Sequence, residues 1–215
     1  HWNLECEAGA IIDLWCYTNC AEVELWLNGT SQGRLKRAPY RKLQWDVPYK
    51  KGTLEAVGYD AAGHEVIRTI IETTEPATKL RIINAHSNTE EDGSTVVILN
   101  LSACDEAGRN VPTADAMVDF EICGAATLLG VGNGNPTSHE AEQAPRRQLF
   151  NGRAQLIIRA HNQAGAVSIR AHADDLESGM LRIETSQAMT AKPSIGASTV
   201  QTSDVKKLNP IDGSL

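Results

Sequence analysis

The sequence predicts an all-β protein made of two tandem immunoglobulin-like β-sandwich domains. Short segments such as EVELWL at positions 22–27 alternate between two faces with a period of two, which is typical of strands with one buried face. Turn residues, among them Asn28-Gly29, follow these segments at short intervals and favour hairpins. No segment shows the longer apolar period of a helix, so the expected sheets have no helical cover.

The first predicted domain, residues 1–76, contains about six strands. Its earliest convincing strand is rich in β-branched and aromatic residues. Trp45 lies in phase with Leu43 and Val47, which predicts that its ring belongs to the core. Six short strands are enough for a small two-sheet sandwich. The expected ranges are 11–17, 22–27, 32–35, 43–47, 54–59 and 64–73.

A short linker is predicted at residues 73–77, because this segment is polar and Pro76 lacks a backbone donor. The second predicted domain, residues 77–186, contains seven or eight strands. From residue 187 to residue 215 the composition becomes polar, which predicts a C-terminal tail. The clearest strands of the second domain are expected at 79–83, 95–103, 117–122, 127–131, 154–160, 166–173 and 180–185.

Charge and hydropathy exclude some classes of partner. The formal net charge is −7, and no basic stripe with interleaved aromatic residues is present, which argues against nucleic acid and anionic membranes. No window approaches the ~18 apolar residues of a membrane span, so membrane insertion is not expected. The sequence starts at His1 without an initiator Met or a signal peptide, which suggests a piece of a longer protein.

The cysteines give a weak indication of compartment. Their number is odd and their spacing is irregular, unlike the paired CxxC ligands of structural zinc sites. Buried free thiols are the favoured interpretation, while a Cys16–Cys20 or Cys104–Cys123 bridge stays open. The localisation is left unknown, with the periplasm or the exterior slightly favoured over the cytoplasm. The five positions are Cys6, Cys16, Cys20, Cys104 and Cys123.

Four segments carry a resemblance to a known family. YTNCAEVELWLNG and GTLEAVGYDAAG, at 17–29 and 52–63, resemble the small β-sandwich module that follows the catalytic barrel in many bacterial glycoside hydrolase family 2 enzymes, the β-galactosidase group. VPTADAMVDFEICG and LLGVGNGNPTSHE, at 111–124 and 128–140, resemble the next immunoglobulin-like module of the same enzymes. Together these matches span roughly Trp2 to Glu184.

The resemblance implies that both catalytic glutamates of a retaining β-galactosidase lie on the barrel, upstream of the matched region. No segment of this chain matches the barrel, and spacing pairs none of its 27 Asp and Glu residues as a catalytic dyad. The expected function is therefore that of a non-catalytic accessory or scaffold region, which supports the barrel or an inter-domain or oligomer contact. A carbohydrate-binding module and a surface adhesion array of immunoglobulin-like domains are the alternatives.

The most unusual local sequence is the loop at residues 130–140, GVGNGNPTSHE. Its glycines permit backbone conformations that other residues resist, and Asn133, Asn135 and His139 supply polar groups. One interpretation is a polar surface loop that contacts sugar or the neighbouring barrel. The favoured interpretation is a self-hydrogen-bonded connection between two strands. A phosphate loop is excluded, since no helix and no P-loop lysine follow.

Two tryptophans are further candidates for contact with sugar or with a neighbouring domain. Trp2 precedes the first strand, in the connection expected from an upstream domain. Trp26 is out of phase with the buried positions of its strand, which indicates the polar face or an interface, with interface packing favoured over sugar binding. The six histidines show no HxH or HExxH spacing, so no metal and no cofactor is expected.

Overall fold

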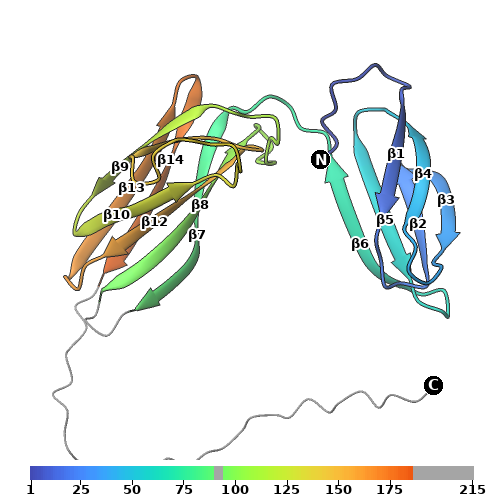
Figure 1. Ribbon diagram of the computed structural model, residues 1–215, viewed down its shortest axis with the longest axis horizontal. Coiled ribbons are helices and arrows are strands. Elements are labelled where there is room, and N and C mark those ends of the chain that lie inside the picture. The colour runs from blue at the N-terminus through green and yellow to red at the C-terminus, as the bar shows by residue number, and fades with distance from the viewer. Residues whose placement is uncertain (90–93, 186–215) are drawn as a thin grey trace, which may run out of the picture.

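The computed structural model describes residues 1–89 and 94–185, which form 14 strands and no helix (Figure 1). The all-β prediction is confirmed. The predicted tail at 187–215 lies outside the described residues. The strands are β1 Ile11–Cys16, β2 Glu22–Leu27, β3 Thr30–Lys36, β4 Leu43–Pro48, β5 Thr53–Tyr59, β6 Glu65–Glu72, β7 Lys79–Thr89, β8 Thr95–Cys104, β9 Met117–Cys123, β10 Ala126–Gly132, β11 Arg146–Gln148, β12 Arg153–Ala160, β13 Gly165–Ala173 and β14 Leu176–Thr185.

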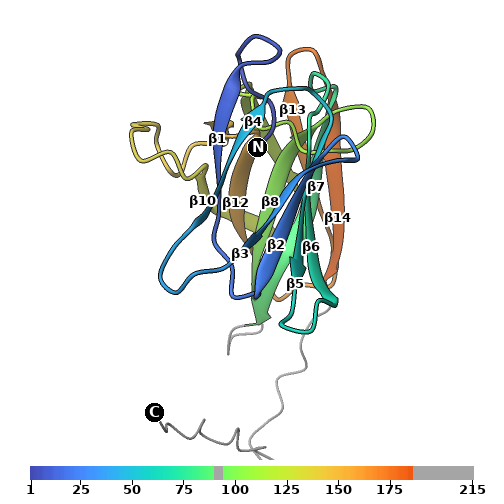
Figure 2. The same cartoon turned by 90° about the vertical axis from the view of Figure 1, so that its right-hand side faces the viewer.

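Strands β1–β6, called here the N-terminal strand group, form two sheets. One sheet pairs β1 with β4, and the other has the order β3-β2-β5-β6, with β6 at its edge (Figure 2). The hairpin between β2 and β3 turns at Asn28 and Gly29, whose φ angles of 50° and 76° confirm the turn that their sequence predicts. The Asn28 side chain also accepts a hydrogen bond from the Thr53 amide at 2.7 Å, which ties the turn to the start of β5.

The core of the N-terminal strand group is apolar and aromatic. Val23, Leu25 and Leu27 face inward as their alternation predicts, and Trp45 is buried with them. Trp2 is also part of this core: its indole is 3% exposed and lies 5.1 Å from the Tyr49 ring, centroid to centroid, in an edge-on arrangement. Its indole nitrogen donates to the Lys50 carbonyl at 2.9 Å.

Strands β7–β14, called here the C-terminal strand group, have the order β10-β12-β8-β7-β14-β13-β9-β11. Two antiparallel halves of four strands meet where β7 and β14 run parallel, at the pair Lys79–Glu177. Side chains from both halves enclose a second, larger hydrophobic cluster. Fully buried members include Leu99, Ile158 and Val167. Each strand group therefore has a core of its own.

The polar segment between β6 and β7 joins the two strand groups (Figure 1). At its start, the Asn3 side chain accepts from the Thr74 amide at 3.0 Å and donates to the Thr74 hydroxyl at 2.8 Å. At its end, the Thr78 amide donates to the Cys104 carbonyl at 2.8 Å. Hydrogen bonds thus tie the linker to both strand groups.

A buried carboxylate completes this junction. Asp105 is 0% exposed and accepts hydrogen bonds from the Glu75 amide at 3.2 Å and from the Arg109 amide at 2.9 Å. The Arg109 guanidinium adds donors at 2.8 Å. Burial alone would raise the pKa of Asp105, but the hydrogen bonds from Arg109 and from the Glu75 backbone hold that pKa below its ordinary value. Asp105 is therefore ionised in the folded chain.

The lowered pKa of Asp105 predicts a pH-dependent contribution to stability. Its stabilisation is present above the unfolded pKa of about 4 and is lost as the pH falls through the lower folded pKa. At pH 7, Asp105→Asn should cost about 1.5–3 kcal/mol, because charge-assisted hydrogen bonds are lost. Denaturant titrations from pH 7 to pH 2 should show the wild type and the variant converging in acid. Asp115→Asn, at an exposed site, is the control. A difference that stays constant with pH would contradict the assignment.

Candidate functional site

The loop that leads from β10 to β11 contains three of the predicted site residues, and its polar groups bond to one another. The Asn133 side-chain oxygen, Oδ1, accepts from the Asn135 backbone amide at 3.0 Å, and the Asn133 side-chain nitrogen, Nδ2, donates to the Gln148 backbone carbonyl at 2.8 Å. The Asn135 side chain in turn accepts from the amide and the hydroxyl of Thr137 at 3.0 and 2.9 Å. These contacts match the self-hydrogen-bonded interpretation.

The buried side chain of Arg147 anchors this loop through hydrogen bonds. Arg147 is 4% exposed and donates to the Val131 carbonyl at 2.7 Å and to the Ser138 hydroxyl at 3.1 Å. The Glu140 carboxylate lies 3.5 Å from the same guanidinium and accepts from the Gln148 amide at 3.1 Å. Sequence reasoning missed Arg147 because arginine is usually exposed and because its strand, β11, is only three residues long.

The other predicted residues do not join this loop in one site. His139 is exposed on the loop, whereas Trp26 is half-buried on β2, in the N-terminal strand group. Trp26 lies across from Ser31 of β3 and Glu55 of β5, on the sheet face opposite to the core. Trp2, in the core, has no exposed ring face for stacking. The five predicted residues are thus divided between the two strand groups.

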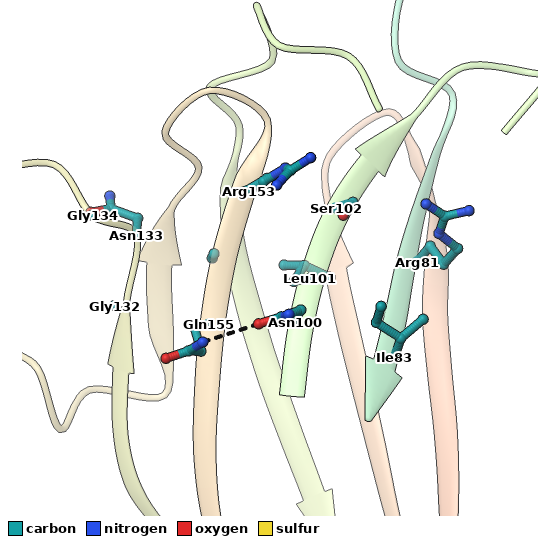
Figure 3. A pocket seen from close by; sticks show the side chains of 11 residues that line it. Arg81, Ile83, Asn100, Leu101, Ser102, Gly132, Asn133, Gly134, Arg153 and Gln155 are labelled. Carbon is teal, nitrogen blue, oxygen red and sulfur yellow. Dashed lines mark hydrogen bonds between the residues drawn. The ribbon is translucent and has the colours of Figure 1, made fainter. Parts of the chain in front are cut away.

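A depression of about 490 Å³ lies on the outer face of β7, β8 and β12 (Figure 3). Strand register explains its composition. Arg81, Ser102 and Arg153 pair across the three strands in one row, and Ile83, Asn100 and Gln155 form the next row. Alternation along each strand points both rows away from the core. Gly132 and Asn133, at the end of β10, complete one side of the depression.

The depression is polar and positively charged. Its lining holds two arginines and no acidic residue, although the whole chain carries a net charge of −7. The Gln155 amide group donates to the Asn100 side-chain oxygen at 3.0 Å (Figure 3). Of the residues predicted from the sequence, Asn133 is the one that lines it. Alternation along each strand indicates which side chains are exposed. Only the pairing of β7, β8 and β12, which the sequence does not give, brings positions 81, 83, 100, 102, 153 and 155 together.

Metal and thiol chemistry find little support in the described residues. Within 1–89 and 94–185, no group of three or more His, Cys, Asp or Glu side chains is placed to hold a metal ion. All five cysteines are free; Cys20 and Cys104 are buried. Burial, with a smaller effect of Cys20, raises the pKa of the Cys16 thiol, which keeps it protonated and weakly nucleophilic. Among the described residues, no candidate membrane-spanning helix is found.

The described residues thus form an all-β module with an internally hydrogen-bonded loop and a shallow polar depression on one sheet face. Comparison with known families assigns this module. Residues 80–182 match glycoside hydrolase family 2 C-terminal domain 5, and residues 9–67 match a family described only as a domain of unknown function. Residues 80–182 thus belong to a C-terminal domain family of glycoside hydrolase family 2, which confirms the resemblance drawn from the sequence.

Individual relatives agree with this assignment. The chain is 32% identical over 190 residues to a β-galactosidase of Bacteroides ovatus, which covers 87% of this chain and 22% of the relative. It is 33% identical over 165 residues to a putative β-glucuronidase of Formosa agariphila, and this match covers 74% of the present chain and 16% of that relative. A solved family 2 structure from Bacteroides cellulosilyticus superposes with a TM-score of 0.80 at 32% identity, covering 86% of this chain and 24% of that one. The chain thus spans about a fifth of the length of these relatives.

The contacts of Arg147 predict its importance for the loop. Arg147→Met keeps most of the side-chain volume but leaves the Val131 carbonyl and Ser138 without their donor. The free energy of unfolding should fall by about 2–3 kcal/mol, because a charged hydrogen-bond donor is removed from a buried site. Hydrogen exchange at the Gln148 amide should accelerate at the same time.

The neighbouring residue offers a matched control for this experiment. Arg146 is 55% exposed at its side chain and lies 3.5 Å from Asp119. Arg146→Met should change the free energy of unfolding by about 0.5 kcal/mol or less, as is usual for surface ion pairs. Equal losses in the two variants would contradict an anchoring role for Arg147.

Proposed function

We propose that this chain is the non-catalytic C-terminal accessory region of a larger family 2 β-glycosidase. In this proposal residues 1–76 and 77–186 are two tandem immunoglobulin-like sandwiches, and an upstream catalytic barrel belongs to the same protein. The relatives support the arrangement, because the chain spans only about a fifth of their length. The two hydrophobic clusters, one in each strand group, support the division into two sandwiches.

One observation carries the scaffold role: the edge strand β6 exposes four aliphatic side chains, those of Val66, Ile67, Ile70 and Ile71, alongside its charged residues. All eight of its residues are exposed, including Ile67 at 56%, Ile70 at 54% and Ile71 at 39%. Clustered aliphatic side chains on an exposed edge strand invite contact with other surfaces, so proteins normally cover them. The upstream barrel is the cover that we propose for β6. The exposed Trp15 of β1, at 52%, extends the same apolar character to the other sheet.

The parent enzyme is proposed to hydrolyse a terminal β-galactoside with retention, through two glutamates on the barrel. The relative from Bacteroides ovatus, a β-galactosidase, supports the galactoside. A β-glucuronide is the second candidate substrate, favoured by the similarity to the putative β-glucuronidase of Formosa agariphila. In both cases the present chain contributes position and stability rather than reacting groups.

Activity measurements test the division of labour. The isolated 215-residue chain should not release chromophore from a nitrophenyl β-galactoside or β-glucuronide above the rate of the buffer, since hydrolysis needs a positioned carboxyl pair. The full-length enzyme should hydrolyse one of the two substrates, which identifies the sugar. Turnover by the isolated chain would refute the accessory assignment.

A charge on β6 tests the scaffold role. Ile70→Lys should leave the isolated chain stable to within about 0.5 kcal/mol, because the site is 54% exposed there. In the full-length enzyme the same lysine would be buried without a partner and should cost about 3–5 kcal/mol of the contact with the barrel. Thermal inactivation of the full-length enzyme measures this loss. Met180→Lys, at a site on β14 that is 76% exposed, is the control. Identical inactivation of wild type and Ile70→Lys would remove β6 from the interface.

A further inference from the structure

We propose that the depression on β7, β8 and β12 binds an acidic oligosaccharide, a chain of sugars that carry carboxylate groups. This site goes beyond the scaffold role, because it would give the accessory region a ligand of its own. Four features support it. They are the spacing of the two arginines, the neutral polar groups near them, the local positive charge, and the pairing of the β8 backbone on both sides.

The spacing of the arginines suits an extended anionic ligand. Arg81 and Arg153 both pair with Ser102, from opposite sides, so their Cα atoms are two strand spacings apart, or about 10 Å. A ligand that crosses β8 can therefore place one carboxylate near each guanidinium, with a hydroxyl above Ser102. Guanidinium groups bind carboxylates with two parallel hydrogen bonds, which makes arginine well suited to this task.

The row beside the arginines offers neutral partners for sugar hydroxyls. The hydrogen bond between Gln155 and Asn100 uses one donor of the first side chain and one acceptor site of the second. Each amide side chain has two donors and one oxygen, so further hydrogen-bonding groups are left on both. Ile83, which is 49% exposed in the same row, offers an apolar contact for the C–H face of a sugar ring. This mixture of amide, hydroxyl and aliphatic groups suits a saccharide better than a bare inorganic anion.

The electrostatics favour an anionic ligand. No acidic residue lines the depression, and the ion pairs of the described residues involve neither Arg81 nor Arg153. Arg81 makes one long hydrogen bond, 3.4 Å, to the Gly108 carbonyl. Two guanidinium groups without carboxylate partners, on a chain of net charge −7, form a local positive site.

The backbone pairing of the strands that form the depression argues against an acidic peptide as the ligand. Peptides that bind to sheets usually add a strand to an open edge and use main-chain hydrogen bonds. Here β8 is paired on both sides, with β7 and with β12, and the depression lies on the face of the sheet rather than at an edge. Over β7, β8 and β12 recognition therefore depends on side chains, with the backbone of Gly132 and Gly134 at one side, which suits the scattered hydroxyl and carboxylate groups of an acidic saccharide.

Calorimetric titration of the intact chain tests the proposal with three probes of similar length. They are a galacturonic acid pentamer, a neutral galactose pentamer and a glutamic acid pentapeptide. The galacturonate pentamer should bind at least ~10-fold more tightly than the neutral pentamer, and more weakly at high salt, because screening weakens exposed charge pairs. Equal binding of the two saccharides, equal binding of the peptide, or no binding at millimolar galacturonate would each overturn the proposal.

Two variants and one control locate the site. Arg153→Gln should weaken galacturonate binding at least ~10-fold. Gly132→Phe should abolish it without changing the charge, because a Cβ at Gly132 meets no atom within 4 Å and the ring can occupy the depression. Arg170→Gln, on the outer face of β13 with a side chain that is 50% exposed, should bind as the wild type does. Unchanged binding in both site variants would overturn the assignment. The scaffold role is measured separately through Ile70→Lys, so either idea can fail alone.

Discussion

The hydrogen bonds of the Asp105 carboxylate are the interaction on which the junction between the linker and the C-terminal strand group depends. It is buried completely, and it collects donors from the linker at Glu75 and from the turn at Arg109. An ionised group in such a place is stable only when its hydrogen-bonding capacity is used. Asp105 therefore fixes the position of the linker at Glu75 relative to the turn that follows β8. Without Asp105, the linker would be tied to the C-terminal strand group chiefly through Thr78, whose amide donates to the Cys104 carbonyl and whose carbonyl accepts from the Glu177 amide. The Thr78 hydroxyl and the Lys79 ammonium add contacts to Glu106.

Local pattern predicted the features of this fold that depend on near neighbours. The alternation around Val23 and Leu25 gave the buried face of β2, and Asn28-Gly29 gave the turn, because both follow from backbone stereochemistry. Features that depend on distant contacts were missed. Arg147 is buried only because Val131 and Ser138 supply partners for its guanidinium. Trp2 precedes any strand in sequence, and it enters the core because Tyr49 and Lys50 lie beside it.

The two candidate surfaces differ in their physics and lie in different parts of the chain. The β6 edge in the N-terminal strand group exposes four aliphatic side chains and has unpaired backbone groups, so it suits a permanent contact that excludes water. The depression in the C-terminal strand group is polar, charged and shallow, and β8 at its centre is paired on both sides. Such a surface suits a soluble ligand that is exchanged. Together the two proposals describe an accessory region with one surface for its own protein and another for a sugar.

The parallel pair between β7 and β14 has a consequence for how the chain folds during synthesis. Lys79 and Glu177 are separated by about 100 residues, so this contact closes a long loop. The C-terminal strand group cannot complete its sheet until β14 has left the ribosome. The N-terminal strand group needs only residues up to 72 for its last strand, and two of its four strand pairs, β2–β3 and β5–β6, join consecutive strands. All the strands of this group, including the β6 edge, are therefore synthesised before the last strand that the second group needs.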